Sequence, residues 1–380
     1  MPARLRSPEL ATRLGIALAI TVTICFATGL ISHFVQNPVA WLPWPPFPAG
    51  LYRFTQGLHV VTGIATIPLL LVKLWSVYPR LFERPVVRSA LHAAERGSIA
   101  VLVGSMIFML VTGLLNAAQW YPWSFFFPAM HYAFAWVAVG ALIIHIAVKL
   151  PVITKALRAP IDPPPIDPPS IDPLGPVGGM DSNGGITRRG VLATTGAATV
   201  LAALSVAGQT VPWLRSLAIL APRSGEGPQG VPINRTARAA GVTMTAVDPA
   251  WALEVRSGAT TRRLGLDELR ALPQTEVVLP IACVEGWSAT ARWRGVRVRD
   301  LVEVVGGRAG DVQFLSLEQG GLYSGTVLPQ RFAEHPDSLV ALEINGETLN
   351  IDHGYPCRLI APNRPGVLQT KWLASMEVLP

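Results

Sequence analysis

The run Cys283-Val284-Glu285-Gly286-Trp287-Ser288 carries one of the three cysteines in a chain of 380 residues. A lone cysteine among Glu, Gly and Trp suits a thiolate metal ligand in a tight turn better than half of a disulfide. Taken by itself, such a residue is more often a buried, unreactive thiol. The remainder of the chain decides between these two interpretations.

The composition predicts a membrane protein. Half of the residues are hydrophobic, only 14% are charged, and the mean hydropathy is +0.40, values outside the range of ordinary soluble proteins. The net charge of +7 comes from arginines without a dense run, which favours membrane topology over nucleic-acid binding. Three cysteines cannot form a disulfide framework, and Cys25, inside an apolar segment, is expected to pack as a small apolar residue.

Four apolar segments each approach the roughly 20 residues that a helix needs to cross a bilayer. They cover about 14–33, 57–77, 99–118 and 131–151. Basic residues precede the first segment, separate the second from the third and follow the fourth, whereas the other loops are rich in Trp and Pro. By the positive-inside rule, the N-terminus and the end of the fourth segment are cytoplasmic.

Five of the seven histidines lie in this part of the chain: His33, His59, His92, His131 and His145. His131 and His145 are 14 residues apart, about four helical turns and roughly 21 Å, with both side chains on nearly one face. This spacing suits two haems held by axial imidazoles, one near each membrane surface. His59 has the same outer depth as His131, so these two form the expected haem-ligand pair.

The inner partner of His145 stays open, because Lys73 and not histidine stands 14 residues after His59. His92 is a weak candidate, and Lys73 and Lys149 can pair with haem propionates or extend to the headgroups. The alternative role for each histidine is packing. In its histidine depths, the segment 10–155 resembles the four-helix membrane cytochromes b of the b561 and hydrogenase or formate-dehydrogenase subunit type. The resemblance implies one or two haems b.

A connector and a fifth apolar segment follow. The linker, 156–186, repeats Ile-Asp-Pro, and this proline density predicts an extended, semi-rigid chain. In 187–220, Thr187-Arg188-Arg189-Gly190 precedes an apolar run to about 214. This pattern predicts a twin-arginine export signal retained as an anchor or a simple fifth helix with positive-inside arginines. Either interpretation places the later residues outside the cytoplasm.

The last segment, 221–380, predicts a soluble mixed α/β domain. Strand-like runs occupy 251–255, 276–282, 312–317, 338–344 and 358–361, and helix-like spacing occupies 266–272 and 298–305. No Ser/His/Asp arrangement, phosphate-binding glycine loop or zinc-site spacing stands out. The predicted fold is therefore multi-domain, with an all-α four-helix transmembrane bundle (1–155), the linker, a fifth membrane helix and the α/β domain.

Four motifs of this domain occur in the order and spacing of one family. They are Cys283-Val-Glu-Gly-Trp-Ser with Trp293-Arg-Gly-Val-Arg-Val-Arg-Asp-Leu301, Ala341-Leu-Glu-Ile-Asn-Gly-Glu-Thr-Leu349, His353-Gly-Tyr-Pro-Cys-Arg358, and Gly366-Val-Leu-Gln-Thr-Lys371-Trp-Leu373. With these motifs, the segment 230–380 closely resembles the sulfite-oxidase family of molybdopterin enzymes. The resemblance implies that Cys283 is the protein's one sulfur ligand to molybdenum, beside the dithiolene of a single molybdopterin.

The resemblance also implies the other residues of the cofactor pocket. By their positions in the motifs, these are His353, Arg358, Gln369, Thr370 and Lys371. Arg and Lys suit a pterin phosphate, as a bidentate fork and a point charge. Asn234 and Arg235 lie where the family contacts the pterin from its N-terminal side, with a turn and a surface charge as the alternatives. Tyr323 lies close to the family's active-site tyrosine, one residue out of register.

Together these features predict a membrane-bound molybdenum oxidoreductase fused to its own cytochrome b. Two-electron oxygen-atom transfer outside the cytoplasm, with reduction of an S- or N-oxide favoured, would exchange electrons with a quinone pool through haem. The expected partners are quinone, a small-molecule or protein-bound oxygen-atom donor or acceptor, and lipid. One alternative is oxidation of sulfite or a similar anion, attracted by arginines that equally suit a solvated face (Arg292, Arg294, Arg297 and Arg299). Another is a non-catalytic electron-transfer cytochrome.

Overall fold

A computed structural model of the chain describes the residues 6–85, 87–161, 187–221, 227–308, 310–321 and 324–380. Most of the Pro-rich linker and Tyr323 therefore lie outside the described residues. The chain divides into two compact units. A helical unit contains the residues 1–26, 61–115 and 121–204, and a mixed unit contains the residues 27–60, 116–120 and 205–380.

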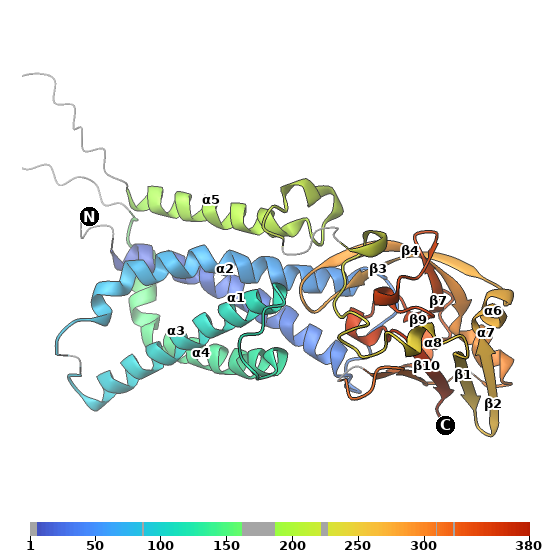
Figure 1. Ribbon diagram of the computed structural model, residues 1–380. Coiled ribbons are helices and arrows are strands. Elements are labelled where there is room, and N and C mark those ends of the chain that lie inside the picture. The colour runs from blue at the N-terminus through green and yellow to red at the C-terminus, as the bar shows by residue number, and fades with distance from the viewer. Residues whose placement is uncertain (1–5, 86, 162–186, 222–226, 309, 322–323) are drawn as a thin grey trace, which may run out of the picture. The chain divides into compact units, whose positions relative to one another are not determined.

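Five long helices carry the apolar segments (Figure 1): α1 (Pro8–Gln36), α2 (Leu51–Leu81), α3 (Ala90–Ala117), α4 (Phe127–Arg158) and α5 (Arg188–Ala207). Each is long and apolar enough to cross a membrane. In α1 and α4, only 11% of the most apolar window is buried inside the protein, which leaves side chains to contact lipid. The predicted four-helix set and fifth helix are confirmed.

The helices differ from the predicted segments mainly at their ends. The helix α4 continues to Arg158, beyond the apolar limit at 151, because a helix can extend past the hydrocarbon layer into the polar interface. The helix α5 ends at Ala207 and not near 214, and a 3-10 helix (Pro212–Leu217) follows it. Gly208 and Pro212 explain this end, because both residues disfavour a continuing α-helix.

Within the helical unit, apolar side chains of four helices meet in one cluster. Leu70, Met106 and Ala138 are buried in it, with Leu18 and Val22 of α1 packed against them. Near the predicted cytoplasmic side, Lys149 forms an ion pair with Glu95, and Lys73 donates to the Ala11 carbonyl at 2.5 Å. Both lysines thus bind neighbouring helices.

The mixed unit contains two five-stranded sheets among its described residues. The first has the order β2-β1-β10-β5-β6, with the strands β1 (Ala252–Ser257), β2 (Thr260–Gly265), β5 (Val312–Ser316), β6 (Gly325–Leu328) and β10 (Leu373–Val378). The second has the order β3-β4-β7-β8, with β9 paired to β7, and comprises β3 (Thr275–Ala282), β4 (Ser288–Arg297), β7 (Leu339–Ile344), β8 (Glu347–Thr348) and β9 (Arg358–Ile360). Only the β1–β10 pair is parallel among these strand pairs.

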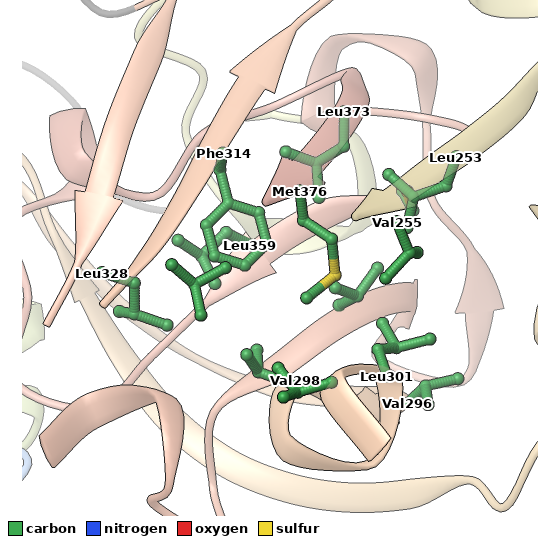
Figure 2. Close-up of a cluster of buried hydrophobic side chains, with 14 of the residues drawn as sticks. Leu253, Val255, Val296, Val298, Leu301, Phe314, Leu328, Leu359, Leu373 and Met376 are labelled. Atoms are coloured by element: carbon green, nitrogen blue, oxygen red, sulfur yellow. The ribbon is translucent and has the colours of Figure 1, made fainter. Parts of the chain in front are cut away.

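The main core combines buried side chains of both sheets with those of short helices. The helices are α6 (Leu266–Ala271), α7 (Val298–Val304) and α8 (Gln330–Ala333). Figure 2 shows Val298 and Leu301 of α7 beneath strand residues such as Phe314 and Met376. Every one of these four side chains is fully buried, and apolar burial of this kind is the main stabilising contribution to a fold. The predicted mixed α/β domain is confirmed.

Candidate cofactor site

A tight turn between β3 and β4 carries Cys283. The Gly286 amide donates to the Cys283 carbonyl at 3.1 Å, and the Cys283 amide donates to the Trp287 carbonyl at 2.9 Å. Gly286 has φ +90°, a left-handed conformation that glycine adopts without steric cost. The turn predicted around Cys283 is therefore present, and its thiol is 1% exposed.

The surroundings of Cys283 oppose a thiolate unless a cation is bound. Burial raises the pKa of the Cys283 thiol well above its usual range, and the nearby Glu285 carboxylate raises it further. That carboxylate accepts a hydrogen bond from Trp287 Nε1 at 2.9 Å. Reactive cysteines have lowered pKa values, so Cys283 fits a metal ligand, deprotonated by the metal itself, better than a free nucleophile.

A pocket at this turn brings separate parts of the sequence together. Its lining residues are Val231, Pro232, Ile233, Asn234, Ile281, Cys283, Trp287, His353, Arg358, Gly366 and Lys371. A bridge between Ala282 and Pro365 holds the Gly366 segment beside the end of β3. Five residues predicted for the site, Cys283, Asn234, His353, Arg358 and Lys371, thus meet at one pocket.

His353 is placed by a short 3-10 helix (Ile351–His353). Asn350 begins this helix, with its Oδ1 accepting from the Asp352 amide at 2.9 Å, and Gly354 ends it with φ +111°. The His353 Nε2 atom lies 2.7 Å from the Pro228 carbonyl, to which it donates. Burial lowers the pKa of His353 to about 4. The ring is therefore a neutral polar group at physiological pH.

Arg358, on β9, is 3% exposed and has its guanidinium fixed by backbone acceptors. Nη1 donates to the His353 carbonyl at 3.0 Å, and Nη2 donates to the Gln369 carbonyl at 3.2 Å. The guanidinium carbon lies 5.2 Å from the centre of the Trp293 ring, and Nε has no hydrogen-bond partner among the described residues. Burial lowers the pKa of Arg358 to about 9.

Lys371 closes the pocket from another side. Its Nζ donates to Asn234 Oδ1 at 3.2 Å, to the Arg235 carbonyl at 2.5 Å and to the Asp352 carbonyl at 3.0 Å. All three acceptors are uncharged oxygens. Burial, followed by the charge of Arg358, lowers the pKa of Lys371 to about 7. An anionic ligand would offset both effects.

The residues fit a phosphate-bearing pterin with a thiolate-bound metal. Two buried cations repel each other, one of them with an unsatisfied Nε donor, and both have pKa values lowered by burial. Phosphate oxygens accept hydrogen bonds from Arg and Lys and supply the opposite charge. Cys283 in the same lining offers sulfur as a metal ligand. This combination carries no nucleophilic triad.

Three other predicted residues lie behind the lining. The Arg235 side chain forms an ion pair with Glu318 at 2.7 Å. The Gln369 amide bonds to backbone atoms, accepting from the Ala361 amide at 3.4 Å and donating to the Arg364 carbonyl at 3.0 Å. Thr370 Oγ1 lies 2.7 Å from Thr326 Oγ1. These side chains fix the pocket wall, and their direct cofactor contact stays a prediction, as does the role of Tyr323.

Several lining residues were not among those predicted for the site. Trp287 lies inside the motif that contains Cys283, and a large aromatic residue at this position could have been predicted to line the pocket. Ile281 precedes the motif on the inward side of β3, and Val231 to Ile233 precede Asn234. Apolar residues of this kind give little sequence signal, because a pocket wall and an ordinary core show the same pattern.

The arginines considered for anion attraction lie elsewhere. Arg292 pairs with Glu276 at 3.6 Å, and Arg294 pairs with Glu343 at 3.1 Å, across neighbouring strands of the second sheet. On β4 these exposed arginines alternate with the buried Trp293. They form a solvated, ion-paired face, and neither lines the pocket.

The candidate haem ligands lie on α2 and α4. His131 and His145 share the single helix α4, as their spacing predicted. Thr112 Oγ1 donates to the Phe108 carbonyl at 2.8 Å and lies 3.0 Å from His131 Nδ1. With its own proton on the Phe108 carbonyl, Thr112 Oγ1 can accept from Nδ1, and this tautomer leaves on Nε2 the lone pair that iron requires.

Each of the two outer histidines faces a glycine of a neighbouring helix. A Cβ atom added at Gly29 would lie 3.0 Å from His59 Cε1, and one at Gly113 would lie 3.5 Å from His131 Cε1. Glycine at these two positions therefore lets each imidazole lie close to the backbone of the neighbouring helix. His59 belongs to the mixed unit and His131 to the helical unit, and their pairing stays a prediction.

Comparisons with known proteins find relatives of parts of this chain. Residues 240–380 match the family described as "Oxidoreductase molybdopterin binding domain". The sulfite oxidase of Arabidopsis thaliana is 32% identical over 152 residues, 31% of this chain and 39% of that protein. "Putative protein-methionine-sulfoxide reductase subunit YedZ1" of Azospira oryzae is 34% identical over 113 residues, 30% of this chain and 42% of that protein.

A solved structure also aligns, that of the sulfane dehydrogenase SoxCD from Paracoccus pantotrophus. The alignment covers 35% of this chain and 40% of that chain, at 20% identity and a TM-score of 0.31. The chain spans about two fifths of the length of each of these relatives. The C-terminal region is a molybdopterin-binding oxidoreductase domain, preceded by five apolar helices that are consistent with a membrane cytochrome.

Proposed function

We propose that this protein is a membrane-bound molybdenum oxidoreductase that reduces an S- or N-oxide with electrons from a quinol, passed through haem b. The observation that carries the proposal is the convergence of Cys283, Arg358 and Lys371 on one pocket of the molybdopterin-binding domain. A cytochrome without catalysis would not require a buried thiol in that lining.

The side chains of the pocket have separate tasks. Cys283 supplies the thiolate ligand to molybdenum, and Arg358 and Lys371 hold the pterin phosphate. The neutral His353 ring, fixed by the Pro228 carbonyl, contacts the pterin as a polar group. When bound, the cofactor supplies two-electron oxygen-atom transfer, which protein side chains cannot perform.

The five helices provide the haem ligands through which electrons from quinol would pass. His59 and His131 would hold a haem b, and the contact of Thr112 with His131 Nδ1 would help to orient that ring as an axial ligand. His145, four turns along α4, holds a second haem if the protein contains one. The YedZ1 protein of Azospira oryzae is named as a subunit of a sulfoxide reductase, and this relative supports reduction as the direction.

The placement in the membrane follows from the basic residues. Arg13 precedes the first apolar segment, and Lys155 and Arg158 end the fourth, so both ends face the cytoplasm by the positive-inside rule. The fifth helix then carries the chain to the outer face. The domain with Cys283 is therefore extracytoplasmic. Electrons would then enter from quinol at the membrane helices and reach the substrate at this domain.

Oxidation of sulfite or a related anion is the second candidate. Its support is the 32% identity to the Arabidopsis sulfite oxidase. Arg292 and Arg294 give it less support, because both are paired with carboxylates on the outer face of the second sheet.

The test is a substrate survey with the purified full-length protein. Quinol-reduced protein is mixed with methionine sulfoxide, dimethyl sulfoxide or an N-oxide, and haem oxidation is followed by its absorbance. In parallel, oxidised protein is mixed with sulfite and haem reduction is followed. Oxidation by an S- or N-oxide supports the proposal, and haem reduction by sulfite alone supports the second candidate. Purified protein that lacks molybdenum would contradict both.

A further inference from the structure

One face of the first turns of α2 contacts the turn that carries Cys283, inside the mixed unit. Tyr52 is 1% exposed and packs in one cluster with Ala282. Arg53 Nη1 donates to Thr290 Oγ1 at 2.9 Å, and Gln56 Nε2 donates to the Val284 carbonyl at 3.3 Å. The contacted residues, Ala282, Val284 and Thr290, lie on both sides of Cys283 in the sequence.

The fourth contact is closest to the predicted haem ligand. A Cβ atom added at Gly286 would lie 2.9 Å from Val60 Cγ2 and 3.9 Å from Val60 Cβ. Val60 directly follows His59. A glycine at 286 therefore serves the positive φ of the turn and also lets α2 approach this closely.

The contacting residues occupy one side of the helix. Steps of 100° per residue place Tyr52, Arg53, Gln56 and Val60 within about 100° of arc, with His59 at the edge of that arc. Phe54 points to the other side and is 62% exposed. The face formed by these four residues, the docking face, therefore fits the Cys283 turn specifically.

The Val284 carbonyl is the polar centre of this contact. It accepts from Gln56 Nε2 and, at 3.3 Å, from Asn116 Nδ2 at the end of α3. Gln56 is 5% exposed. The buried Gln56 amide donates to the carbonyl of the residue next to Cys283. Such an amide is unusual on an apolar helix, because an apolar side chain at this position would avoid the desolvation cost.

We propose that the docking face is the electron-transfer contact of the protein, with Gln56 as the positioning residue between the haem at His59 and the metal at Cys283. The inference rests on the proposed function. The covalent path from His59 to Gln56 is three residues long, and one hydrogen bond then reaches the residue next to Cys283. Each transfer oxidises one ferrous haem to ferric and reduces the metal by one electron. Two transfers, with two protons from solvent, convert one sulfoxide to sulfide and water, and quinol restores the haem.

The contact itself is tested without any cofactor, by a disulfide. Val60→Cys with Gly286→Cys places two Cβ atoms at a separation within the range of natural disulfides, roughly 3.5–4.5 Å. A protease site is inserted between residues 162 and 186 of the full-length protein in membranes. After oxidation and cleavage, we expect the two fragments to stay joined until a reductant is added. Phe54→Cys with Gly286→Cys is the matched control, and its fragments should separate. Separation with both pairs would overturn the proposal.

The electron-transfer role is tested with Gln56→Leu, which keeps the size of the side chain and removes the donor. Haem oxidation by the substrate should slow by about fivefold, the factor that one hydrogen bond contributes to a docked state. Molybdenum content, haem content and the haem midpoint potential should match the wild type, and Phe54→Ala should match it in every measurement. Equal rates in Gln56→Leu and wild type overturn this inference alone. Absence of haem oxidation in the wild type itself would instead refute the proposed function.

Discussion

Lys371 Nζ donates to Asn234 Oδ1 at 3.2 Å, across 137 residues of sequence. Asn234 precedes every strand of the domain, and Lys371 lies two residues before its last strand, β10. The bond closes the pocket between the two ends of the domain. It also holds a lysine whose three acceptors are uncharged, so no carboxylate oxygen accepts a hydrogen bond from Lys371 among the described residues.

The first prediction concerns the pH dependence of stability without cofactor. Burial lowers the pKa of Lys371 to about 7 from an ordinary 10.5, so the folded protein binds fewer protons than the unfolded chain between these values. Stability therefore rises with pH across this window, by about 2 kcal/mol between pH 7 and pH 9 for one such group. Lys371→Met should remove that rise. Thermal midpoints of protein from cells without molybdopterin measure it.

The control for Lys371 is Lys155→Met, near the end of α4, which should keep the wild-type slope. Equal slopes in Lys371→Met and wild type would show that Lys371 is charged throughout this range. Bound cofactor should also flatten the slope, because its phosphate raises the pKa of Lys371 again.

The second prediction separates the two buried cysteines of the C-terminal region. Cys283→Ser removes the soft sulfur ligand, so molybdenum content and substrate turnover should fall to background. Cys357 lies in the main core, and burial raises its pKa far above the usual range. Cys357→Ala should keep molybdenum and cost about 1 kcal/mol of stability. The molybdenum content of each variant is measured by mass spectrometry. Equal metal loss in both variants would contradict the assignment of Cys283 as the metal ligand.

The third prediction tests how His131 is held. Thr112→Val removes the acceptor for His131 Nδ1, and loss of such a supporting bond lowers metal affinity by about 10- to 100-fold. Haem b should be retained weakly and lost on dilution in detergent. Ser105→Ala, on the same helix with its hydroxyl bonded only to the Leu102 carbonyl in the described part of the chain, should retain haem fully. His131→Ala should abolish binding, as measured by the pyridine haemochrome spectrum.

The fourth prediction concerns the guanidinium fork of Arg358. Lysine keeps the charge and cannot reach both the His353 and Gln369 carbonyls. Arg358→Lys should lower the free energy of unfolding by about 2 kcal/mol and lower the pterin content of the purified protein. Arg294→Lys, at an exposed ion pair, should change stability by no more than about 0.5 kcal/mol. Similar losses in the two variants would contradict the role of Arg358.

The sequence was sufficient for the long helices and for half of the ten described strands, namely β1, β3, β5, β7 and β9. Long apolar segments leave a single outcome in lipid, because each backbone group must bond within its own helix. The strands β2, β4, β6, β8 and β10 were not predicted. In β4, the buried Trp293 alternates with the charged Arg292 and Arg294, so the segment lacks the apolar run of a typical strand. Burial of Trp293 against the core outweighs the cost of two exposed, ion-paired arginines.

The site was predictable where its residues stand in motifs that resemble those of a known family. Cys283, His353, Arg358 and Lys371 stand in such motifs, and the structure brings all four to one pocket. The acceptors that fix them were not predictable, because the Pro228, Asp352 and Arg235 carbonyls exist in every chain and acquire a role only through folding. For the same reason the Val284 carbonyl, beside the most conspicuous cysteine, gave no signal of its contact with Gln56.

The central claim is that electrons from the haem reach a metal bound by Cys283. Its most direct test is the absorbance of quinol-reduced haem after methionine sulfoxide is added, in wild-type protein and in Cys283→Ser with equal haem content. The account predicts rapid haem oxidation in the wild type and none in Cys283→Ser. Haem oxidation at the same rate in both proteins would contradict it.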